Sequence, residues 1–139
     1  MSFAWADRTG LLVASSGPGG SPLAMVPFDA RPGAWPAALL PVGGAEAGVF
    51  SAGVRAVAFD SGTSTRPPGQ LAILSVSPEA LYIATLTQDD SPGLASVESL
   101  PLGSLTPTSA VFSYNGDLVV AARAENDLVQ TALLLLRAR

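Results

Sequence analysis

The sequence of 139 residues contains neither cysteine nor histidine. Without cysteine there is no disulfide and no thiolate to act as nucleophile or metal ligand. Without histidine, histidine-ligated zinc sites and a Ser-His-Asp triad are excluded as well. We therefore predict that the protein is not an enzyme, and that it has no catalytic residues, no metal site and no cofactor.

Charged residues are scarce. They make up 13% of the chain, against about 25% in an average soluble domain. The seven basic residues are all arginine, they are scattered along the chain, and the net charge is −4. No basic run is present to follow a phosphate backbone, so nucleic acid is not an expected partner. The hydrophobic fraction of 48% instead suggests a surface that is partly apolar or covered by another molecule.

Long apolar stretches are also missing. The longest aliphatic run covers residues 132–136, which is far shorter than the roughly 18 residues of a membrane-spanning helix. Residues 1–7 have neither a basic start nor an apolar core, so they do not resemble a signal peptide. We expect no membrane span. An intracellular, cytoplasmic location is favoured, although the compartment stays open.

What the chain does contain is a threefold internal repeat. Each copy has a short β-prone segment with an aromatic residue, then a polar turn, then an aliphatic segment. The aromatic residues are Trp5, Phe59 and Phe112, at intervals of 54 and 53 residues. Two nearly equal intervals are typical of repeat architectures. The copies, within one domain of residues 1–139, are assigned to residues 3–53, 54–107 and 108–139.

Each repeat is predicted to be a β-meander. Short apolar runs alternate with clusters of Gly, Pro, Asn, Asp and Ser, which is the pattern of strands joined by turns. Asn115-Gly116 is the clearest hairpin turn, because both residues tolerate positive φ. Twelve prolines and fourteen glycines disfavour long helices. Residues 127–137 fit either a strand or a helix capped by Asn126, and their position in the repeat favours the strand.

Several polar segments have alternative chemical interpretations. Residues 17–21 (GPGGS) are glycine-rich like a phosphate-binding loop but lack the Gly-Lys-Ser/Thr sequence, so a turn is favoured. Residues 60–65 and 89–91 carry oxygen ligands that suit calcium, yet neither segment has the spacing of an EF-hand. We interpret both as solvated loops.

The order of strand, polar turn, aliphatic strand, turn and third strand resembles a blade of a β-propeller. Residues 114–121 lie where WD40-like and related propellers have their polar turn and second strand. The Gly-His and Trp-Asp dipeptides of WD40 blades are absent, so no functional residue carries over. The resemblance implies an all-β fold of three β-meander blades in a partial, open β-propeller. A β-sandwich or barrel is the alternative, and a mixed α+β fold is favoured least.

Three blades do not close a ring, since propellers typically have about four to eight. An open arc exposes two apolar blade faces and an edge strand. We therefore predict a non-catalytic interaction subunit that completes a propeller or larger assembly by self-association or with a partner protein. The alternatives are a glycan- or small-ligand-binding propeller and a carboxylate- or metal-dependent propeller hydrolase. The candidate contact residues are Phe3, Trp5, Trp35, Leu128, Leu134 and Leu136.

Overall fold

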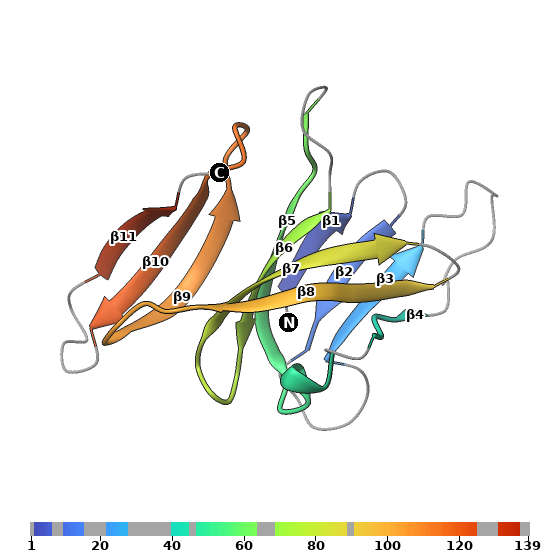
Figure 1. Cartoon of the computed structure of the whole chain (residues 1–139), viewed down its shortest axis with the longest axis horizontal. Helices are drawn as coiled ribbons and strands as arrows, with labels where there is room; N and C mark the ends of the chain where they lie inside the picture. The colour runs from blue at the N-terminus through green and yellow to red at the C-terminus, as the bar shows by residue number, and fades with distance from the viewer. Residues whose placement is uncertain are drawn as a thin grey trace.

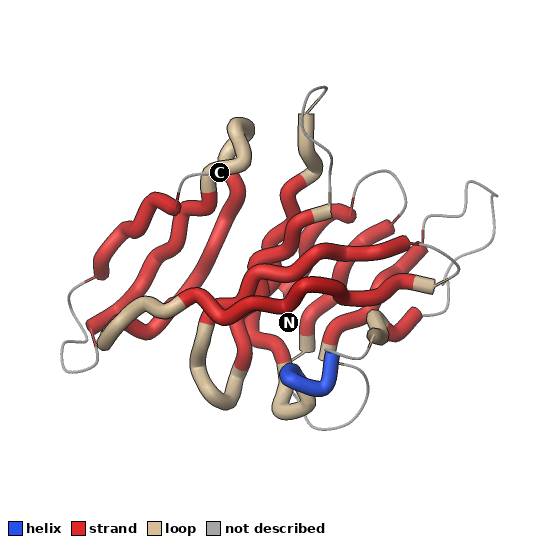
Figure 2. The backbone as a smooth tube through the Cα atoms, in the orientation of Figure 1, coloured by secondary structure: helices blue, strands red, loops and turns tan. Residues whose placement is uncertain are grey.

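The computed structural model confirms an all-β chain (Figures 1 and 2). Its described residues contain eleven strands and one 3-10 helix, η1 (Ala47–Phe50). The strand that was favoured over a helix near the C-terminus is present as β11 (Thr131–Leu136). The structure describes residues 2–6, 10–15, 22–27, 40–44, 47–63, 69–88, 91–124 and 131–136.

The strands form three separate antiparallel sheets, in place of the two layers of a sandwich or a closed barrel. In all three sheets the spatial order of the strands follows their order in the chain. Sheet A consists of β1 (Ser2–Ala6), β2 (Gly10–Ala14), β3 (Leu23–Pro27) and β4 (Leu40–Pro41). Sheet B consists of β5 (Val54–Asp60), β6 (Gln70–Ser75), β7 (Leu81–Gln88) and β8 (Pro92–Leu100). Sheet C consists of β9 (Leu105–Phe112), β10 (Leu118–Ala124) and β11.

The three sheets share one pairing register. The aromatic residue of each repeat lies opposite the first leucine of the following strand. This common register allows each position of one sheet to be matched to a position of the others. The matched pairs are Trp5 with Leu11, Phe59 with Leu71, and Phe112 with Leu118.

Sheet B lies between the other two sheets, and its strands alternate accordingly. On β6, Leu71 and Ile73 belong to the core shared with sheet A, whereas Ala72 and Leu74 belong to the core shared with sheet C. Successive side chains of a strand point to opposite faces, so a strand covered on both sides is apolar throughout. Each fully buried leucine or isoleucine contributes about 1.5–3 kcal/mol.

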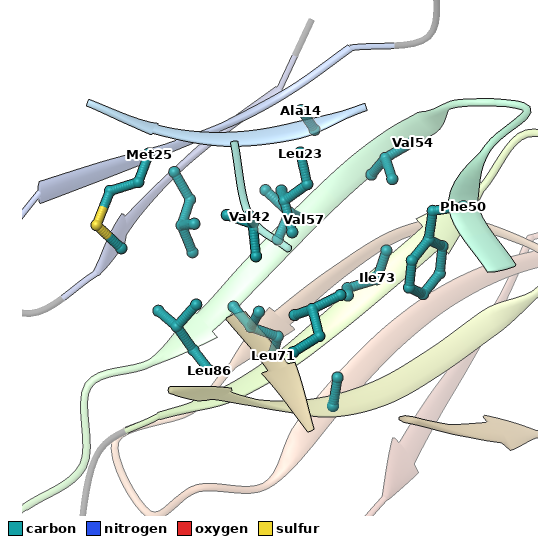
Figure 3. Close-up of a cluster of buried hydrophobic side chains, with 13 residues drawn as sticks. Ala14, Leu23, Met25, Val42, Phe50, Val54, Val57, Leu71, Ile73 and Leu86 are labelled. Carbon is teal, nitrogen blue, oxygen red and sulfur yellow. The ribbon is translucent and has the colours of Figure 1, made fainter. Parts of the chain in front are cut away.

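The core between sheets A and B is closed at one end by η1 (Figure 3). The side chain of Phe50 is 1% exposed, and its ring meets that of Tyr82 edge to face, with centroids 5.2 Å apart. Such an arrangement suits the ring quadrupoles of an aromatic pair. The aromatic contact therefore joins the segment that follows sheet A to the third strand of sheet B.

The first strands of the three sheets lie next to one another. Strand β5 contacts β1 on one side and β9 on the other (Figure 1). The later strands of each sheet extend away from this line of first strands. The chain thus stacks three meanders side by side, with one edge of each sheet gathered together.

Two turns show why their glycines are needed. Gly116 has a φ of 84°, and the Ser113 N–H donates to the Asp117 carbonyl at 2.8 Å, which closes the predicted Asn115-Gly116 turn. Gly44 has a φ of 105°, and a Cβ at this position would lie 2.7 Å from the Leu94 carbonyl oxygen. Only glycine accommodates both the backbone conformation and the close approach.

Strand β9 begins at Leu105, a few residues before the start assigned to the third repeat. The pairing of β9 with β10 shifts register between Ala121 and Ala122, leaving Thr108 as an extra residue. Its hydroxyl donates to the Ala121 carbonyl at 3.1 Å. Pro107 lies beside this bulge, which is where a strand tolerates a residue without an N–H.

Candidate interaction surface

Each sheet has two faces, which we name by their neighbours. The front face is the one that packs on the preceding sheet of the chain, and the back face is the opposite one. The back face of sheet A packs on the front face of sheet B, and the back face of sheet B packs on the front face of sheet C. Both contacts between sheets therefore join a back face to a front face.

The shared register identifies the same back-face positions in all three sheets, on the second and third strands. In sheet A they are Leu12, Ala14, Leu23 and Met25. In sheet B they are Ala72, Leu74, Leu81 and Ile83. In sheet C they are Val119, Ala121, Leu133 and Leu135.

Most of these positions are buried in the first two sheets, whereas in the third two are exposed and two, Val119 and Ala121, are half-buried. All four in sheet A, and Ala72, Leu74 and Leu81 in sheet B, are buried. In sheet C, by contrast, Leu133 is 75% exposed and Leu135 is 55% exposed. Val111 on β9, directly opposite Val119, is 59% exposed. We call the residues Val111, Val119, Ala121, Leu133 and Leu135 the open face of sheet C.

No charged side chain belongs to the open face of sheet C. Arg123 follows Ala121 by two positions on β10, so strand alternation places it on the same side at the edge of the face. Ser109 lies opposite Ala121 on β9. An apolar centre with a polar margin is the usual make-up of a protein–protein interface.

The polar contacts near sheet B fit structural roles. Arg55 on β5 donates to the Pro107 carbonyl on β9 and lies 3.6 Å from a carboxylate oxygen of Glu79. The first of these contacts joins sheets B and C directly. Asp60 is buried, and its Oδ1 accepts a hydrogen bond from the Gly62 N–H at 2.9 Å, which fixes the turn after β5.

The polar loops considered for calcium are only partly described. Ser64, Thr65, Asp89 and Asp90 lie outside the described residues. Among the residues that the structure describes, no group of three acidic side chains comes together to hold a metal ion.

The structure describes the side chains of only two of the six candidate contact residues. Leu134 and Leu136 on β11 are half-buried and pack against the core shared with sheet B. Phe3 and Trp5 lie on β1, opposite Val13 and Leu11, but their side chains are outside the described residues. Trp35 and Leu128 also lie outside the described residues.

The exposed residues of β11 are the neighbours of the two that were predicted. Residues 133–136 are all leucine, so the sequence gives no alternation to say which of them face outward. Leu133 and Leu135 become distinguishable only once the register with Ala121 and Val119 is known.

Comparisons with known protein families, with curated proteins and with solved structures find no match to this chain. Within the described ranges, no helix has the length and apolar character required to cross a membrane.

Proposed function

We propose that the protein is a non-catalytic structural subunit that binds other protein through the faces of its sheets. The observation that carries this proposal is the open face of sheet C, whose counterparts in sheets A and B are buried. Large apolar areas left exposed on a soluble protein mark sites of association. The function is thus to supply three sheets to a larger β-assembly.

A β-propeller is the assembly that best fits these features. Its blades are four-stranded sheets arranged around a central channel. The proposal is supported by the contacts of β5 with both β1 and β9, and by the stacking of the three sheets in chain order. Because closed propellers have about four to eight blades, further sheets have to come from another chain or another part of a longer one.

The area of the open face of sheet C limits the free energy that a partner gains by covering it. Full burial of a leucine or valine is worth about 1.5–3 kcal/mol, and Leu133, Leu135 and Val111 retain more than half of their exposure. Covering the three gives roughly 3–6 kcal/mol on that scale. Association costs about 4–15 kcal/mol in lost freedom of motion. A contact limited to these three side chains is therefore weak, and a stable complex has to bury more than this face alone.

The proposal is tested by making the open face polar. The double variant Leu133→Glu/Leu135→Glu is compared with the wild type and with Val49→Glu, which changes an exposed apolar residue of η1 outside sheet C. We expect the wild type and Val49→Glu to associate in sedimentation velocity, and the double variant to be monomeric with unchanged far-UV circular dichroism. A wild type that is monomeric, and as soluble as the double variant, contradicts the proposed function.

A further inference from the structure

The front face of sheet B covers the back face of sheet A, and the front face of sheet C covers the back face of sheet B. The front face of sheet A is the counterpart of these two covering surfaces. By register, its positions match those through which sheets B and C pack on their predecessors. Every one of these positions in sheet A is apolar. They are Phe3, Trp5, Leu11, Val13, Ala24 and Val26. Ala24 and Val26 are already buried within the chain, Leu11 and Val13 are half-buried, and the side chains of Phe3 and Trp5 lie outside the described residues.

Sheet A and sheet C present nearly the same front-face residues on their second strands. Leu11 corresponds to Leu118, and Val13 corresponds to Val120. Leu118 and Val120 are buried against sheet B, whereas Leu11 and Val13 are half-buried. Strand β2 therefore carries the same pair of side chains that already covers the back face of sheet B within this chain.

The open face of sheet C likewise repeats the surface that this pair covers. Leu133 corresponds to Leu81 in sheet B, and Leu135 corresponds to Ile83, a side chain of the same size. The differences lie on the second strands, where Val119 stands in place of Ala72 and Ala121 in place of Leu74. The front face of sheet A and the open face of sheet C thus resemble the two halves of one contact that the chain has already formed.

We infer that the open face of sheet C is covered by the front face of sheet A from a second copy of this chain. The same contact then forms twice, because each copy offers one front face and one back face. A head-to-tail contact between two copies closes a ring when the rotation permits, and two copies of three sheets make six, within the range of closed propellers. This inference rests on the proposed function and names its partner.

A head-to-tail ring accounts for the stability of the complex better than two C sheets packed face to face. The ring covers the open face of sheet C and the half-buried Leu11 and Val13 of each copy, whereas the face-to-face dimer leaves Leu11 and Val13 half-buried. In the ring the second contact forms within an existing complex, at a high effective concentration. Both apolar cores between sheets, among the described residues, also join a back face to a front face.

A mixing experiment tests the arrangement. Val13→Glu disables the front face of sheet A, and Leu133→Glu disables the open face of sheet C. Each variant alone is expected to be a monomer by light scattering. An equimolar mixture is expected to form a heterodimer through the one contact that keeps an intact front face and an intact open face, weaker than the wild-type dimer with its two contacts. A purification tag on one variant identifies that complex by co-elution. The milder Val13→Thr, which keeps the branched shape, is expected to weaken the wild-type dimer at least about tenfold, as for a hydroxyl buried without a partner.

The outcomes separate this inference from the proposed function. If Val13→Glu and Val13→Thr fold, by circular dichroism, and remain dimers while Leu133→Glu does not, the dimer is face to face; the inference is then wrong and the proposed function stands. Assemblies that keep growing with concentration would show an open filament and overturn the ring. A wild type that stays monomeric, with Leu133→Glu changing neither solubility nor mass, overturns both.

Discussion

A matched pair of leucine substitutions measures how differently the two back faces are covered. Leu81 on β7 and Leu133 on β11 occupy the same register position, opposite Leu74 and Ala121 respectively. Leu81 is fully buried, and Leu133 is 75% exposed. Replacing each by alanine removes the same atoms, so the difference in stability reports the covering of the face.

The magnitude at Leu81 follows from its burial. Removing three carbon groups at about 0.8 kcal/mol each lowers the free energy of unfolding by about 2.4 kcal/mol. The cavity left behind raises the loss, to within the range of about 2–5 kcal/mol for buried leucines. For Leu133→Ala in the monomer we expect a change within about 0.5 kcal/mol, as for an exposed residue.

The assay is urea unfolding followed by far-UV circular dichroism, at protein concentrations where light scattering gives the monomer mass of 14.0 kDa. At concentrations where the chain associates, Leu133→Ala is expected to lose stability as well, because the open face is then covered. Equal losses at both positions in the monomer would refute the account of the open face. A loss below about 1 kcal/mol at Leu81 would refute the packing of sheet C on sheet B.

Three further substitutions test local features of the fold. Gly44→Ala is expected to lower the free energy of unfolding by about 1–3 kcal/mol, because its positive φ and the nearby Leu94 carbonyl both disfavour a side chain; no loss in urea unfolding would contradict this. Asp60→Ala is expected to cost about 1.5–3 kcal/mol by loss of an acceptor for a backbone N–H. Asp60→Asn retains the acceptor oxygen, so a loss as large as that of alanine would refute the turn argument. Glu79→Ala is expected to change stability by at most about 1 kcal/mol, because its ion pair with Arg55 is partly exposed; thermal unfolding in low and high salt tests this.

The division into three sheets was predictable from the sequence because the repeat preserves the pairing register. Trp5, Phe59 and Phe112 recur at nearly equal intervals, and each pairs with the first leucine of the next strand. Conserved spacing between an aromatic residue and its partner strand is what a repeated meander requires. The strands themselves were marked by apolar runs between turn residues.

The exposed surface was less predictable, for a physical reason. A strand covered on one side shows alternation between apolar and polar residues, but β11 is leucine from 133 to 136 and gives no such signal. The prediction named Leu134 and Leu136, which the structure places half-buried against the core shared with sheet B. The outward direction of Leu133 and Leu135 depends on pairing with β10, which is a long-range property.

The start of β9 shows a second limit of sequence analysis. Prolines and small polar residues between 101 and 109 indicate a loop. In the structure β9 begins at Leu105 and continues through Pro107, because the adjacent bulge at Thr108 makes this part of the strand tolerate a residue without an N–H. A bulge depends on the partner strand, so local composition does not reveal it.

The mass of the wild-type chain in solution shows whether two copies of the chain associate. Light scattering on a sizing column, over a hundredfold range of concentration, distinguishes one copy from two. We expect a dimer of twice the 14.0 kDa chain mass, which dissociates to the monomer on dilution. A cooperatively folded monomer of 14.0 kDa at every concentration would contradict it.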